Sequence, residues 1–194
     1  MSRLNLKSVA LLHGMLAVFV LATHASAQEP LHIRIDQLID QTTTSPQAET
    51  VNDYEFIRRV CLDLTGMPPT IEALNAFLVD GSPDKRTGLV DQLLNTNAYV
   101  RHLTTSLDIM LMERRRYQHV KQEEWLEWLH TAVQQNKPWT QIASEVLSAD
   151  GVDPAKRAPV RFYLDRGSEP NLLTRDVARV FFGRDLQCAQ CHDH

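Results

Sequence analysis

The sequence lacks the features that mark several classes of protein. Three cysteines in 194 residues are too few for a disulfide-dense scaffold. The 20 lysines and arginines do not outnumber the 24 acidic residues, and a formal net charge of −4 gives no electrostatic reason to expect nucleic-acid binding. The alternation of apolar and polar residues that indicates β-strands is nearly absent, as are internal repeats and low-complexity tracts. These absences leave a mostly α-helical globular domain as the expected class.

The longest apolar run lies at the N-terminus. Two basic residues precede an apolar stretch over residues 9–22, and Ala25-Ser26-Ala27 follow it. This is the layout of a secretory signal peptide, so we expect removal of residues 1–27 and a mature chain that begins at Gln28. The alternative is a retained single-helix anchor, for which the run is short. No later segment is apolar enough to cross a membrane, so we expect an exported protein, periplasmic or extracellular at the cell surface.

The rest of the chain predicts a compact array of short helices. Apolar residues recur at helical spacing in eight segments, 32–40, 52–66, 71–80, 81–95, 99–116, 123–135, 141–149 and 171–185. Expected N-caps are Asn52 or Asp53, Thr70, Ser82 and Thr140. Gly66 is the expected end of the second helix. Residues 150–170 contain three prolines and two glycines and indicate a loop before the last helix, in which residues 160–164 could be extended.

Apolar stripes on these helices indicate the core. The residues expected to face inward include Leu74, Phe77, Leu78, Leu94, Leu103, Leu107, Met110, Leu111, Trp125, Leu129, Leu173, Val177, Val180 and Phe181. Cys61 shares an apolar stripe and reads as a small buried hydrophobe. The run Arg114-Arg115-Arg116 reads as a solvated helix end.

The last eight residues, Gln187 to His194, have the sequence "QCAQCHDH" and contain the motif with a recognisable chemical function. Cys-x-x-Cys-His is the attachment signal for c-type haem. Two thiols on one turn of chain can each add across one vinyl group of the porphyrin, and the following histidine lies beneath the iron. In this interpretation Cys188 and Cys191 anchor covalent haem c, and His192 is the axial ligand of the haem iron.

Three other interpretations of the motif remain open. The first is a thiol–disulfide redox pair, although such pairs usually follow a strand in a βαβ unit. The second is a zinc site, which would normally need a second, separated ligand pair. The third is a structural disulfide or chance. If haem binds, Val177, Val180 and Phe181 could supply one apolar wall at most, so we expect an exposed haem with an unassigned sixth ligand.

Two long stretches carry a family resemblance. "EFIRRVCLDLTGMPPTIEALNAFLVDGSPDKRTGLVDQLL" and "NLLTRDVARVFFGRDLQCAQCHDH" resemble the opening block and the haem-motif block of the planctomycete-type cytochrome C domain family of unknown function. The resemblance runs from about Leu31 to His194 and implies a secreted bacterial protein whose haem triplet is Cys188, Cys191 and His192. Family members continue past this motif, so the resemblance implies that residues 31–194 form a domain truncated at its C-terminus.

The sequence therefore leads to two functional hypotheses. The first is a secreted haem-carrying electron-transfer domain with an unknown redox or protein partner. The second is a non-catalytic secreted interaction or scaffold module whose cysteine pair forms a local disulfide. Either would be an electron carrier or binding domain rather than a stand-alone enzyme. We expect no nucleic-acid partner and no catalytic residues.

Overall fold

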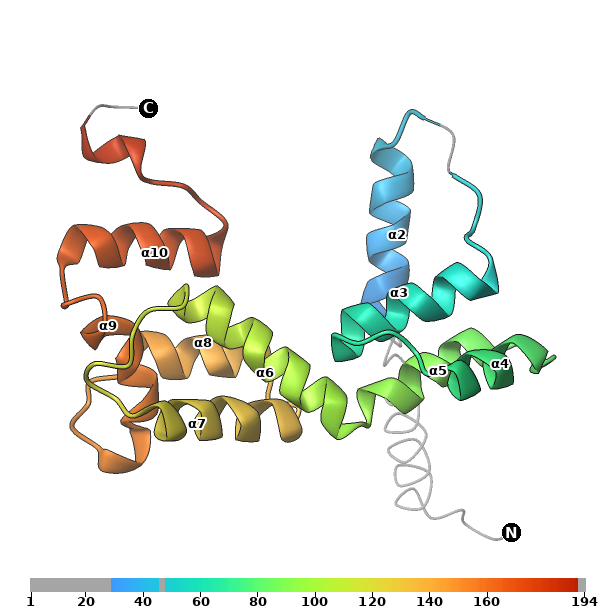
Figure 1. Cartoon of the computed structure of the whole chain (residues 1–194). Coiled ribbons are helices and arrows are strands. Elements are labelled where there is room, and N and C mark those ends of the chain that lie inside the picture. The colour runs from blue at the N-terminus through green and yellow to red at the C-terminus, as the bar shows by residue number, and fades with distance from the viewer. Residues whose placement is uncertain (1–28, 46–47, 192–194) are drawn as a thin grey trace, which may run out of the picture. The chain divides into compact units, whose positions relative to one another are not determined.

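The computed structural model describes residues 29–45 and 48–191, which fall into two compact units divided after Thr50 (Figure 1). The predicted signal peptide lies outside the described residues. Every regular element within them is helical, which confirms the mostly α class. None of these helices is both long and apolar enough to cross a membrane.

The first unit contributes one described helix, α2 (Leu31–Thr42). Its residues are all exposed, including Ile35, Leu38 and Ile39, whose helical spacing predicted it. The second unit contains the remaining elements in chain order: α3 (Asp53–Thr65), α4 (Ile71–Val79), α5 (Lys85–Leu94), α6 (Asn97–Met112), α7 (Gln122–Gln134), α8 (Trp139–Leu147), η1 (Pro154–Lys156), η2 (Ala158–Val160), α9 (Arg161–Leu164), α10 (Pro170–Phe182) and η3 (Cys188–Gln190).

The second unit has two hydrophobic clusters, and α6 packs beside both. The smaller cluster joins α3, α4 and α5 through buried Ile57, Cys61 and Phe77. The larger cluster gathers α6 to α10 around buried Leu111, Met112, Val120, Trp125, Leu129, Val146, Val160 and Phe162. The expected stripe of α10, Leu173, Val177, Val180 and Phe181, packs against this larger cluster. The apolar periodicity thus identified the inner faces of most helices.

Two of the four predicted N-cap positions are confirmed by a side-chain hydrogen bond. Asn52 accepts a hydrogen bond from the Glu55 amide at 2.9 Å, and Thr70 accepts one from the Ala73 amide at 3.2 Å. Ser82 is not a cap, because its amide and hydroxyl both donate to the Asp80 carboxylate, and α5 starts later, at Lys85.

The predicted cap at Thr140 is also wrong. The amides of Gln141 and Ile142 donate to the Pro138 carbonyl at 2.9 and 3.1 Å. The first helical turn therefore begins at Pro138, and Thr140 lies inside it.

The segment from 150 to 170 is more helical than expected. Residues 160–164 are not extended, because α9 spans Arg161–Leu164 directly after η2. Arg161 and Phe162 are both fully buried here. A helical turn also lets the Arg161 guanidinium reach the Asp165 carboxylate four residues later, at 2.8 Å.

Three residues expected in the core are instead exposed. Leu78 and Met110 are each 41% exposed, and Leu94 is 38% exposed. Leu78 and Leu94 lie in the last turns of α4 and α5. Met110 lines an open apolar hollow together with Trp139 and Val180.

Gly66 ends α3 in the left-handed conformation, with φ of 73°. A Cβ at this position would lie 2.6 Å from Nδ1 of His102 on α6. We expect Gly66→Ala to lower the free energy of unfolding by about 1–3 kcal/mol, since it adds both a disfavoured φ and a clash.

Gly88 is the matched control for Gly66. It lies inside α5, and no atom comes within 4 Å of its added Cβ. Gly88→Ala should be neutral or raise stability by up to about 1 kcal/mol through helix propensity. Urea unfolding of both variants measures the difference, and equal effects would contradict the role given to the backbone of Gly66.

Cys61 behaves as the buried hydrophobe that the sequence predicted. It is 6% exposed in the α3–α4–α5 cluster, and burial raises the pKa of its thiol. We expect Cys61→Ala to cost about 1–3 kcal/mol of stability. Haem content after expression with a cytochrome c maturation system should be unchanged. A folded Cys61→Ala chain without haem would show that Cys61 takes part in attachment.

Candidate functional site

The end of α10 places the cysteine motif. Gly183 ends the helix with φ of 62°, and the Gln187 amide donates to the Asp185 carboxylate at 2.9 Å, which turns the chain. The Cys191 amide then donates to the Cys188 carbonyl at 3.2 Å, closing the turn η3. The structure therefore brings Cys188 and Cys191 together on one turn. Both thiols are exposed and free, whereas His192 lies outside the described residues.

The motif lies along the polar face of α10. A small hollow of about 210 Å³ beside it is lined by Asn171, Thr174, Arg175, Leu186 and Ala189. The apolar wall expected from Val177, Val180 and Phe181 is not available, because these residues pack into the larger cluster. The exposed thiols thus fit covalent attachment of a porphyrin, but the apolar stripe of α10 supplies no wall for one.

Metal-ligand residues do not gather elsewhere in the described residues. No group of three or more His, Cys, Asp or Glu side chains within 29–45 and 48–191 is arranged to hold a metal ion. His119, between α6 and α7, has the Asp165 carboxylate 3.1 Å from Nδ1 of its ring. The thioether of buried Met112 lies 3.6 Å from the Arg166 guanidinium.

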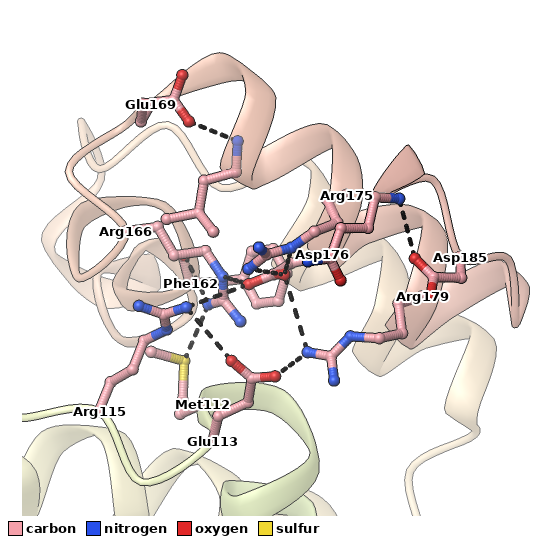
Figure 2. Close-up of polar contacts among 12 residues, drawn as sticks. Met112, Glu113, Arg115, Phe162, Arg166, Glu169, Arg175, Asp176, Arg179 and Asp185 are labelled. Atoms are coloured by element: carbon pink, nitrogen blue, oxygen red, sulfur yellow. Dashed lines mark hydrogen bonds and ion pairs between the residues drawn. The ribbon is translucent and has the colours of Figure 1, made fainter. Parts of the chain in front are cut away.

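A buried ion-pair cluster fastens α10 to α9 and to the end of α6 (Figure 2). Asp176, fully buried on α10, accepts a hydrogen bond from Nε of Arg166 at 2.7 Å. Arg166 also donates to the Leu111 and Phe162 carbonyls at 2.8 and 2.9 Å. Because this guanidinium links three elements at once, it fixes the position of α10, and hence of the motif that follows it.

Three further arginines face the same carboxylate from the surface, and Arg179 is the most distant of them, at 3.8 Å. Arg175 donates to Oδ1 of Asp176 at 3.0 Å, and Arg115 lies 3.4 Å from Oδ2. Arg115 is therefore not part of a solvated helix end, as the sequence indicated, but points toward Asp176. Its Nε is buried and has no hydrogen-bond partner. Four guanidinium groups thus converge on the two oxygens of the Asp176 carboxylate.

The outer side of the cluster is closed by Glu113. Its carboxylate pairs with Arg115 at 3.3 Å and also with Arg179. Glu113 and Arg114 both have positive φ, 50° and 61°, directly after α6 ends. Non-glycine residues rarely adopt this conformation, and it persists where surrounding contacts hold it. The ion pairs of Glu113 and Arg115 with α10 provide such contacts.

The carboxyl group of Asp176 remains ionised despite its burial. Burial alone would raise the pKa of Asp176, but the hydrogen bonds and the positive charges of Arg166 and Arg175 together outweigh burial and leave the pKa below its ordinary 3.8. Burial lowers the pKa of Arg166, and the bond to Asp176 opposes that shift. Asp176 and Arg166 therefore form an ion pair inside the protein.

A second buried arginine supports the same region. Arg161 donates to Asp165 at 2.8 Å, to Asp108 at 3.2 Å and to the Arg115 carbonyl at 2.9 Å. Its guanidinium carbon lies 3.7 Å from the centre of the Tyr117 ring. The loop from α6 to α7 is thus held on α9 by charge-assisted hydrogen bonds and a cation–π contact.

Sequence reasoning missed both networks, although one signal was present. Asp176 falls at helical spacing with Leu173, Val177 and Val180, within the buried stripe of α10. An acid at a core position needs a cationic partner, because an unpaired buried charge is too costly. The partner, ten residues earlier in the expected loop, carried no local signal.

Residues 34–194 match the PSCyt2 family, described as a protein of unknown function (DUF1549). No curated protein and no solved structure matches the chain. The family match covers most of the sequence, including both hydrophobic clusters and the cysteine motif. The chain therefore belongs to the PSCyt2 family of proteins of unknown function.

Proposed function

We propose that the chain is an exported domain that carries a covalent c-type haem and transfers electrons. The observation that supports this most directly is the turn η3, on which Cys188 and Cys191 are both exposed and not joined by a disulfide. Addition of two thiols to the vinyl groups of one porphyrin requires this proximity. The predicted signal peptide agrees with it, since the export pathway leads to the compartment where bacterial c-type cytochromes are assembled.

The chain's own residues have separate roles in this proposal. The haem iron supplies the one-electron chemistry. Cys188 and Cys191 would hold the porphyrin through thioether bonds, and His192 would bind its iron. Asp176 and Arg166 position the motif by fixing α10. A redox or protein partner follows from the proposal, but no stand-alone enzymatic activity does.

The second candidate is a secreted scaffold module in which the two cysteines form a local disulfide. The same turn favours it, because free thiols three residues apart can also approach each other in an oxidising compartment. The two candidates predict different spectra. A disulfide has no visible absorption, whereas haem gives an intense Soret band.

The deciding experiment is expression of the full chain with its signal sequence in a host that has a cytochrome c maturation system. Purified protein is denatured, extracted with acidified organic solvent and examined by absorption spectroscopy. We expect a Soret band that stays with the protein, because thioether-bound haem is not extracted. Colourless protein with one disulfide between Cys188 and Cys191, located by peptide mass spectrometry, would favour the scaffold module.

A further inference from the structure

Arginines lie on the outer side of α10, beside the motif at one end, and on the chain after α6 that faces this helix. Arg175 lines the hollow beside Ala189, within the cysteine turn, and is about one-third exposed. Arg179 is 46% exposed one turn further along α10. Arg184 follows the helix end and is exposed. We call this the basic surface. It comprises Arg115, Arg175 and Arg179, which Figure 2 labels, and their exposed neighbours along the chain, Arg114 and Arg184.

The carboxylates around the basic surface do not balance it. Glu113, Asp176 and Asp185 lie among these arginines (Figure 2). Asp176 is already paired with buried Arg166, so part of its negative charge is neutralised below the surface. Within 48–191, no ion pair joins an acidic side chain to Arg114 or Arg184. Positive charge therefore remains on this face.

The surplus of positive charge on the basic surface contrasts with the net negative charge of the whole chain. The formal net charge of the sequence is −4, so the rest of the molecule is more acidic than the average. Such asymmetry orients an approaching partner, because charged patches steer association and fix register. A long polyanion such as nucleic acid would also meet the acidic remainder and be repelled. An acidic patch of similar size on another protein meets only the basic surface.

We propose that the basic surface docks an acidic protein partner beside Cys188 and Cys191. That this partner exchanges electrons with the motif rests on the proposed function. The docking itself does not, because it depends on side chains present before any haem is attached.

The first test measures the local potential with the thiol as reporter. In a reduced, haem-free Cys191→Ser chain, Cys188 is the exposed thiol and Cys61 is buried. The Cys188 thiolate attacks one sulfur of an aromatic disulfide probe, forming a mixed disulfide and releasing an aryl thiolate. Rates are compared for a probe with two carboxylates and for neutral dipyridyl disulfide. Because both probes react with the same thiol, the ratio of the two rates does not depend on the accessibility of Cys188 or on its thiolate fraction. The ratio therefore reports the electrostatic potential at Cys188.

We expect Arg175→Gln with Arg184→Gln to lower this ratio by about fivefold at low salt, and added salt to lower it in the wild type. The matched control is Arg58→Gln with Arg59→Gln, which removes the same charge from α3 and should leave the ratio nearly unchanged. Arg184→Gln alone serves if the double variant unfolds, since Arg184 makes no ion pair in the described residues. A ratio insensitive to salt and to Arg184 would overturn the proposal.

The second test identifies the class of partner. Amide resonances of the haem-free chain are followed by NMR during addition of poly-glutamate, poly-lysine or duplex DNA. We expect poly-glutamate to shift residues around Arg175 and Arg184, and the double variant to lose these shifts. Tighter binding of DNA than of poly-glutamate, or equal shifts with poly-lysine, would overturn an acidic protein partner. Neither test needs haem, so failure here is distinguishable from failure of the haem proposal.

Discussion

Replacement of Asp176 by alanine is expected to lower the free energy of unfolding by about 3–5 kcal/mol. The carboxylate and its partner Arg166 are both fully buried, and they lie 2.7 Å apart. Removing one member leaves the other charge without its counter-ion inside the protein. Urea unfolding followed by circular dichroism measures the change. A loss below 1 kcal/mol would mean that water or another side chain compensates Arg166.

The more exposed ion pairs that Glu113 forms in the same cluster provide the control. Glu113→Gln removes a carboxylate that is 33% exposed and pairs with Arg115 and Arg179. Exposed ion pairs contribute about 0–1 kcal/mol, so this variant should be much milder. The double variant Asp176→Leu with Arg166→Met should recover part of the loss, because it removes both buried charges together.

The same carboxylate gives the chain a dependence on pH. The pKa of Asp176 is lower in the folded chain than its ordinary 3.8. The contribution of the charged form is therefore complete above the unfolded value and is lost as pH falls through the folded pKa. The stability difference between wild type and Asp176→Asn should be constant at neutral pH and shrink below about pH 4. A difference that stays constant into strong acid would contradict the ion pair.

The helices could be predicted because local signals agreed with the packing. α3 has a capping side chain at Asn52, a stop at Gly66 and an apolar stripe that includes Ile57 and Cys61, and all three are used in the structure. Residues 160–164 gave the opposite result, because their branched and aromatic side chains suggested an extended segment. Burial of Arg161 and Phe162 under α6 and α7 favours the helix instead, and tertiary burial outweighs propensity there.

The candidate site was predictable only in its cysteine motif. The spacing of Cys188 and Cys191 specified a single turn, and the structure forms that turn. The surroundings of the turn depend on which face of α10 it meets. That face carries Thr174 and Arg175 rather than the apolar stripe, because Val177 and Phe181 pack into the core. The direction of the chain after Gly183 decides this, and nothing in the local sequence specifies it.

Substitution of both motif cysteines by serine is expected to abolish covalent haem. Serine hydroxyls do not form thioether bonds with the vinyl groups, and the exposed positions of Cys188 and Cys191 mean that little packing is lost. The variant should therefore remain folded, with unfolding midpoints close to those of the wild type. Haem staining after denaturing electrophoresis should be positive for the wild type and negative for the variant.

Single variants divide the contributions of the two thiols. Cys188→Ser and Cys191→Ser each leave one thioether, so haem should remain attached at reduced yield. The α-band of the pyridine haemochrome should shift to longer wavelength, because one vinyl group remains conjugated with the porphyrin. Cys61→Ala is the matched control, since its thiol is buried in the other cluster and should not affect attachment. Haem that survives denaturation in the Cys188→Ser, Cys191→Ser chain would require attachment through another residue, and the assignment of the motif would then be wrong.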